Sequence, residues 1–137
     1  MTKIDMQTMR YINLLDNVAR VKTAKCFTYN DTVIFAVPAY AMRKAVGPAG
    51  INVKNIEGKL GKRVKIIRDF NDISEAKRFI EDVVSPVTFV SLELRENIFI
   101  LTAGVRNKAI LFGRNKKRYE ELKQIVEDNF GKDLKII

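Results

Sequence analysis

One short pattern occurs twice in this chain and constrains its fold more than any other feature. The pattern Gly-Lys-x-[Val/Leu]-Lys-Ile-Ile stands at residues 61–67 and again at residues 131–137. A looser echo relates Val-Ile-Phe-Ala-Val at residues 33–37 to Asn-Ile-Phe-Ile-Leu at residues 97–101. Internal repetition of this kind indicates one supersecondary unit built twice. We therefore expect two equivalent halves that meet near residue 69, with domains at residues 1–69 and 70–137.

The order of predicted elements is the same in both halves: helix, strand, strand, short helix, turn, helix, strand. Asn30-Asp31 lies between two β-rich runs and is a strong hairpin signal. We expect an α+β fold in which each half is a three-stranded sheet with helices packed on one face. The expected ranges are 4–20, 25–29, 32–37, 41–46, 51–60 and 63–67 in the first half, then a helix from 71 to Pro86, 87–94, 98–101, 105–112, a longer helix through 119–130, and 133–137.

Apolar residues at helical spacing predict the inner faces of the first helix of each half. Asp72 and Glu75 have the spacing of a capping box at the start of the second of these helices. The expected inner residues are Met9, Ile12, Leu15, Val18 or Ala19, then Ile73, Ala76, Ile80 and Val83; Cys26, Tyr29, Phe35 and Phe99 are also expected in the core, and Tyr40 is the least certain.

The first turn is Gly47-Pro48-Ala49-Gly50, between two short apolar helices. Glycine at both ends permits a sharp turn and close approach by another backbone. The N–H groups of the following helix would point into the turn, which suits a phosphate group. Pro48 removes one of the backbone donors. A helix corner closed by a glycine cap is the simpler interpretation of this turn taken alone.

The second turn is Gly113-Arg114-Asn115-Lys116, in which lysine stands where the last glycine belongs. A lysine tolerates a left-handed backbone poorly, so we expect this turn to be reshaped. Its basic side chains would compensate for the missing glycine.

Positive charge gathers around the two turns. The chain has 25 Lys and Arg against 16 Asp and Glu, a net charge of +9. A solvated surface usually mixes both signs, so a polyanion is the partner that this distribution favours. The basic residues are Arg43, Lys44, Lys54, Lys59, Lys62, Arg63, Lys65 and Arg68 in the first half, and Arg106, Lys108, Arg114, Lys116, Lys117 and Arg118 in the second.

Composition argues against several other functions. The chain has no histidine and one cysteine, which removes histidine catalysis, the commonest zinc ligand and any intrachain disulfide. It contains no nucleotide-binding loop of the G-x-x-x-x-G-K-[ST] type. We therefore expect no enzyme activity, cofactor, metal or small-molecule substrate. No transmembrane-length apolar run and no signal sequence are found, so a cytoplasmic protein without a membrane partner is expected.

Each half resembles a type II KH domain, with the order α-β-β-α-α-β around a Gly-x-x-Gly turn. The tandem pair, and the run Arg10-Tyr11-Ile12-Asn13-Leu14, resemble the archaeal NusA-related family of transcription elongation and termination factors. The resemblance implies that the turns hold single-stranded RNA, about four nucleotides for each KH groove. It also implies RNA polymerase as a possible partner.

The resemblance and the charge pattern together nominate RNA-binding residues on both turns. They are Arg43, Lys44, Gly47, Pro48, Ala49, Gly50, Val53 and Lys54 in the first half, and Lys108, Gly113, Arg114, Asn115, Lys116, Lys117 and Arg118 in the second.

Two other functions remain open at this point. The altered turns would suit a KH-fold module that docks proteins and has lost RNA binding. A ribosomal or RNA-assembly protein is the other alternative, because some ribosomal proteins share the type II KH fold. An enzyme ranks last.

Overall fold

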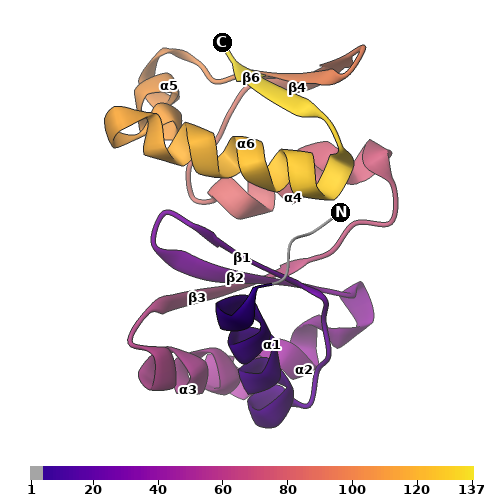
Figure 1. Cartoon of the computed structure of the whole chain (residues 1–137), viewed down its shortest axis with the longest axis vertical. Helices are drawn as coiled ribbons and strands as arrows, with labels where there is room; N and C mark the ends of the chain where they lie inside the picture. Colours follow the sequence, from indigo (N-terminus) through magenta and orange to yellow (C-terminus); the bar gives the residue numbers. More distant parts are fainter. Residues whose placement is uncertain (1–4) are drawn as a thin grey trace. The chain divides into compact units, whose positions relative to one another are not determined.

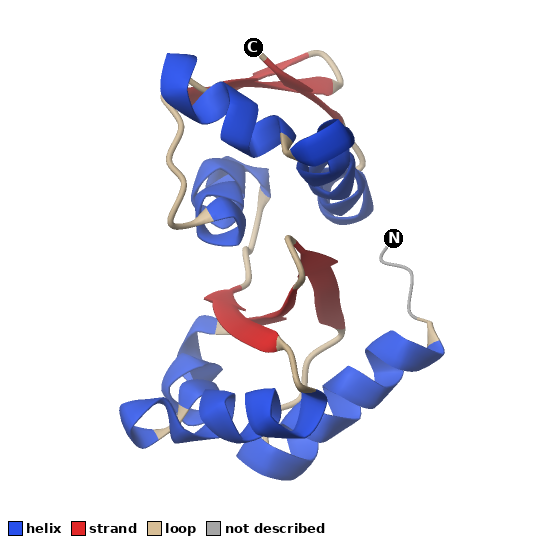
Figure 2. Cartoon of the chain, turned by 90° about the vertical axis from the view of Figure 1, so that its left-hand side faces the viewer, coloured by secondary structure: helices blue, strands red, loops and turns tan. Residues whose placement is uncertain are grey.

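The computed structural model describes residues 5–137, and Figure 1 follows the chain from one end to the other. The described residues divide into two compact units, 5–71 and 72–137, and each has its own three-stranded sheet. In both units the helices lie on one face of the sheet (Figure 2). The domain ranges 1–69 and 70–137 stay a prediction.

The first unit has its central strand paired on both sides. Strand β2 pairs antiparallel with β1 through the predicted hairpin and parallel with β3. Asn30 and Asp31 both have positive φ, 51° and 58°, which is the backbone of the hairpin turn that these residues favour. The elements are α1 (Met6–Ala19), β1 (Lys25–Tyr29), β2 (Thr32–Val37), a 3₁₀ turn (Ala39–Ala41), α2 (Met42–Val46), a second 3₁₀ turn (Pro48–Gly50), α3 (Ile51–Leu60) and β3 (Arg63–Arg68).

The second unit repeats this topology, with β5 between antiparallel β4 and parallel β6. The prediction of two α-β-β-α-α-β units in the type II KH order is confirmed. The elements are a 3₁₀ turn (Ile73–Glu75), α4 (Ala76–Val84), β4 (Ser91–Arg95), β5 (Ile98–Thr102), α5 (Val105–Phe112), a 3₁₀ turn (Arg114–Lys116), α6 (Lys117–Phe130) and β6 (Asp133–Ile136).

Strand pairing corrects one alignment between the halves. Thr32 stands opposite Arg63 in the first sheet, and Ile98 stands opposite Asp133 in the second. The equivalent of Phe35 is therefore Leu101, two residues beyond Phe99, with which the sequence echo matched it. Because successive side chains of a strand point to opposite faces of the sheet, a shift of two residues leaves the predicted inward-facing positions unchanged.

The first core is built from one row of α1 and the central strand. Tyr11, Leu15 and Ala19 are buried at i, i+4 spacing, and Leu15 and Phe35 are fully buried. A fully buried side chain of this size contributes about 1.5–3 kcal/mol to folding. The prediction that Met9 faces inward was wrong, because it is 52% exposed and Tyr11 occupies the inner row instead.

The start of α4 differs from the prediction in two details. Ile73 is exposed, and the inner face includes Phe79, whose ring meets that of Phe130 edge-on at 5.8 Å between centroids. Asp72 is the N-cap of this turn, and its carboxylate accepts the Ser74 N–H at 2.8 Å. The Glu75 carboxylate lies 3.3 Å from the Arg78 guanidinium.

The predicted strand 87–94 is too long, because β4 begins only at Ser91. Its partner β5 ends at Thr102, so residues before Val90 have no strand opposite them. The Thr88 carbonyl instead accepts the Asn107 side chain, with 2.8 Å between the Asn107 Nδ2 and the oxygen.

Candidate nucleic-acid interface

The two turns have the same backbone. Gly47 has φ 79° and ψ 165°, and Gly50 has φ 72° and ψ 22°. At the equivalent positions Gly113 has φ 72° and ψ 177°, and Lys116 has φ 61° and ψ 22°. The expectation that Lys116 would reshape the second turn was wrong.

Hydrogen bonds explain why lysine is held in this left-handed conformation. The Gly113 N–H donates to Ala109 O at 3.0 Å, and the Lys116 N–H donates to Gly113 O at 3.2 Å. The first turn makes the same two bonds, from Gly47 and Gly50. A left-handed backbone costs a residue with a Cβ about 1–2 kcal/mol. The repeated bonds and the helices on both sides outweigh this cost.

A side chain from the following helix braces each turn. Asn52 Nδ2 donates to the Lys44 carbonyl at 2.9 Å, and Arg118 Nη1 donates to the Ile110 carbonyl at 3.3 Å. Asn52 and Arg118 occupy the same position in the two units, and both satisfy a carbonyl near the end of the preceding helix. We call these contacts the turn braces. Sequence reasoning missed Asn52 and assigned Arg118 to RNA alone.

The braces explain why the first residue of each turn is glycine. A Cβ at Gly47 would lie 2.9 Å from the Asn52 amide group, and a Cβ at Gly113 would lie 2.8 Å from Arg118 Cγ. At Gly50, by contrast, a Cβ would meet nothing within 4 Å. The first glycine therefore serves the close packing of the brace, whereas the last position requires only a left-handed backbone.

The helices after the turns begin without a side-chain cap. Neither α3 nor α6 has a side chain that accepts a hydrogen bond at its N-cap, so the positive end of each helix dipole faces its turn. The first turn of α3 contains no acidic residue, whereas that of α6 contains Glu120. No acidic side chain in the first turn of α3 therefore offsets the positive end of that helix dipole.

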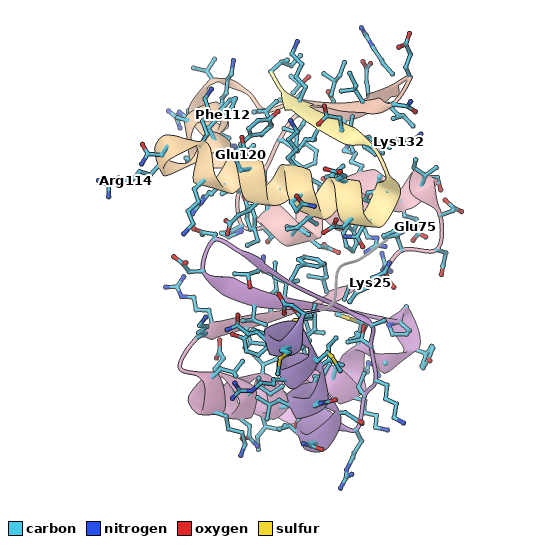
Figure 3. The ribbon with its side chains drawn as sticks, viewed as in Figure 1. Lys25, Glu75, Phe112, Arg114, Glu120 and Lys132 are labelled. Atoms are coloured by element: carbon cyan, nitrogen blue, oxygen red, sulfur yellow. The ribbon has the colours of Figure 1, made fainter. Side chains whose placement is uncertain are left out.

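Cations surround both turns. Arg43, Lys44 and Lys54 are exposed around the first turn. Lys108, Arg114 and Lys116 are exposed around the second, and the Arg114 side chain projects away from the ribbon (Figure 3). Within residues 5–137 these six side chains form no ion pair. Their charge is available to an external anion.

An apolar groove of about 540 Å³ lies beside the first turn. It is lined by Met42, Arg43, Val46, Gly47 and Pro48. Met42 and Val46 share one helix face with the buried Ala45 by their spacing, but both are only half-buried and so contribute apolar surface to the groove.

The predicted groove residue Val53 is half-buried and packs against the hydrophobic core. In the second unit the positions of Met42 and Pro48 carry Lys108 and Arg114. Phe112, at the position of Val46, packs against the Tyr119 ring at 5.3 Å between centroids. The second turn is therefore more basic and less apolar than the first.

The described residues offer no set of metal ligands, since no three carboxylate or thiol groups gather in one place there. Among the helices of residues 5–137, none combines the length and apolar character needed to cross a bilayer.

Comparison with known proteins gives a consistent set of relatives. Three relatives are named probable transcription termination protein NusA. The protein from Halococcus morrhuae is 25% identical over 91% of this chain and 90% of the relative, and the protein from Methanocaldococcus jannaschii is 25% identical over 93% of this chain and 71% of the relative. The protein from Halobacterium salinarum is 21% identical over 96% of this chain and 94% of the relative. The chain is thus similar, over most of its length, to archaeal proteins that carry the NusA name. No protein-family model matches it.

A solved structure supports the fold assignment of the chain. The crystal structure of APE1850 superposes with a TM-score of 0.68 at 20% identity, and the match covers 98% of this chain and 100% of that one. At this identity the likeness concerns the fold alone.

Proposed function

We propose that this chain is a non-enzymatic RNA-binding factor of transcription, which holds single-stranded nascent RNA at its two turns and modulates elongation or termination. The observation that carries the proposal is the repeated turn: an uncapped helix N-terminus and a left-handed backbone recur at the same place in both units, and unpaired cations surround each turn, although at different positions. Backbone N–H groups and free cations are the groups that bind phosphates.

The two turns would divide the work. The first has the apolar groove of Met42 and Val46, in which bases can lie while the phosphates contact Arg43 and Lys44. The second has the cations Lys108 and Arg114 at the positions of the groove residues Met42 and Pro48, and it would mainly attract the strand. Substitutions in the apolar groove should therefore alter the preference for particular RNA sequences, whereas substitutions of Arg114 should lower the affinity for all RNA sequences alike.

RNA titration followed by fluorescence anisotropy tests the proposal. If about four to six phosphates are neutralised, log affinity should fall with log salt with a slope of about −3 to −4. The test variant carries Ala49→Asp and Asn115→Asp, because both positions are left-handed and exposed and aspartate tolerates that backbone. The added carboxylates should repel phosphate while the fold is retained.

The control places the same added charge away from both turns. Leu94→Glu and Gln124→Glu alter exposed positions on β4 and α6, and this variant should keep most of the affinity. Weak binding with no salt dependence, or equal losses in both variants, would contradict the proposal.

Docking to a protein is the second candidate, and the apolar groove beside the first turn favours it. A hydrophobic side chain of a partner would fit a groove lined by Met42, Val46 and Pro48. Binding to RNA polymerase that persists after nuclease treatment, in a protein with no RNA affinity, would favour this function. Co-purification with ribosomes would favour a ribosomal or assembly role.

A further inference from the structure

A polar groove lies in the first unit, at the end of α3 remote from the turn. Helix α1 packs beside α3 (Figure 1), and the groove of about 580 Å³ is lined by residues of α1 and by the end of α3. Its cations are Arg10, Lys59 and Lys62, and all three are exposed. We call it the far groove. No carboxylate lines it among the described residues.

The groups around these cations are hydrogen-bonding rather than acidic. The amide side chains of Gln7, Asn13 and Asn17 line the far groove beside Arg10. The nearby Glu57 carboxylate is engaged elsewhere, because it accepts the Val64 N–H at 3.0 Å. Within residues 5–137, Arg10, Lys59 and Lys62 form no ion pair. The far groove therefore has the charge and donors of an anion-binding surface.

The exposed face of α3 connects this groove to the turn. Lys54 and Gly58 lie one helical turn apart on that face, and Lys59 follows directly. The helix has 10 residues and so spans about 15 Å. Basic residues at its start, Lys54, and at its end, Lys59 and Lys62, could hold one continuous anionic strand.

Gly58 is an independent observation on the same face. It stands inside α3 with an ordinary helical backbone, and an added Cβ would meet nothing within 4 Å. A glycine inside a helix is destabilising relative to alanine, and no packing within the described protein requires it here. Glycine does allow another backbone to approach the helix closely.

The second unit shows that the fold itself does not require this surface. The positions of Lys54 and Gly58 are occupied by Glu120 and Gln124 in α6, and Glu120 lies on the exposed side of that helix (Figure 3). At equivalent positions of this helix, the first unit thus has a lysine and a glycine, whereas the second has a glutamate and a glutamine.

We propose that the RNA strand bound at the first turn continues along the exposed face of α3 and that its phosphates enter the far groove, where Arg10, Lys59 and Lys62 bind them. The inference rests on the proposed RNA function, and it extends the binding site of the first unit beyond the four-nucleotide groove of the turn. Continuity of the cations with the turn favours RNA over an acidic protein segment.

The test compares a short RNA of about four nucleotides, which fills one KH groove, with a long RNA of about twelve. The variant Lys59→Gln with Lys62→Gln should lower the affinity for the long RNA roughly two- to thirtyfold, which is the range for the loss of two exposed ion pairs. It should leave the affinity for the short RNA unchanged. Its salt slope for the long RNA should become shallower by about 1.4, the value for two fewer phosphates on a single strand.

Gly58→Gln, which copies the second unit, separates binding from folding. Glutamine favours helix, so the melting temperature should rise while affinity for the long RNA falls. Lys77 is an exposed lysine on α4, and Lys77→Gln is the matched control, which should change the affinity for neither RNA.

Each failure has a distinct signature. If the unaltered protein binds neither RNA, the proposed function fails. If it binds both and the Lys59 and Lys62 changes affect neither, the RNA path along α3 is wrong while the proposed function stands. Equal losses for short and long RNA would also overturn the path. Retained RNA affinity together with lost binding of a polyglutamate peptide would assign the far groove to an acidic protein.

Discussion

Replacing the first glycine of the first turn should destabilise the first unit far more than replacing the last. Gly47 has φ 79° and ψ 165°, a region that is essentially restricted to glycine, and a Cβ there would meet the Asn52 amide at 2.9 Å. Gly50 is also left-handed, but an added Cβ has open space. Gly50→Ala therefore tests the left-handed backbone alone, whereas Gly47→Ala adds stronger backbone strain and the close packing of the brace.

The magnitudes follow from the two costs at Gly47. Backbone strain contributes about 1–3 kcal/mol. Displacement of Asn52 breaks its 2.9 Å bond to Lys44 O, a loss of about 0.5–1.5 kcal/mol. Gly47→Ala should thus lower the free energy of unfolding by about 2–4 kcal/mol, against about 1 kcal/mol for Gly50→Ala. In an Asn52→Ala background, the cost of Gly47→Ala should shrink, because part of the clash is gone.

Thiol labelling at Cys26 is a suitable assay, because this side chain is buried in the first unit at 3% exposure. Burial raises the pKa of the thiol to about 12, so the native protein should react slowly. Since 1.4 kcal/mol is a factor of ten, Gly47→Ala should accelerate labelling about thirtyfold to several hundredfold, and Gly50→Ala about fivefold. Equal rates in the two variants would refute the role of the brace.

Four further predictions concern the second turn, RNA affinity, the response to pH and the core of the first unit. Lys116→Gly should raise the free energy of unfolding by up to about 1 kcal/mol in urea denaturation. The change relieves backbone strain of about 1–2 kcal/mol, but glycine also increases the conformational entropy of the unfolded chain, which offsets part of this gain. A loss of stability would contradict the prediction. Arg114→Ala with Lys117→Ala should lower affinity equally for all RNA sequences and flatten the salt slope, and a changed sequence preference would count against it. Hydrogen bonds from Ser74 lower the pKa of Asp72, so this carboxylate stabilises the fold above its unfolded pKa of about 3.9, and the stabilisation is lost as pH falls below that value. Asp72→Ala should therefore reduce the acid sensitivity of unfolding. An unchanged dependence of stability on pH would show that Asp72 does not contribute to acid unfolding. Cys26→Ser should lower the melting temperature, since it places a hydroxyl in an apolar core, and an unchanged value would contradict its burial.

The strands and the order of elements could be predicted from the sequence because local signals and the repeat agreed. The range expected for α5 matches the structure, as do those for β1 and β2. The inner face of α1 could not be fixed, because Tyr11 has a polar hydroxyl that accepts a hydrogen bond from Gln7 at 2.8 Å and yet buries its ring. Only the packed helix distinguishes this row from one through Met9.

The candidate site was predictable in position but not in its details. Intrinsic preference predicted that Lys116 would distort the second turn, whereas the brace and flanking helices impose the same backbone as at Gly50. The Asn52 brace depends on a contact to a residue eight positions earlier, which no local pattern indicates. Contacts of the nominated residues with RNA stay a prediction.

The most direct test of the central claim is to follow backbone amide resonances by NMR while single-stranded RNA is added. If phosphates bind at the helix N-termini, the largest shifts should fall on the N–H groups of residues 50–53 and 116–119, at the starts of α3 and α6. The Gln124→Glu control should give the same pattern. Shifts that leave both segments unchanged while RNA binds elsewhere would contradict the account.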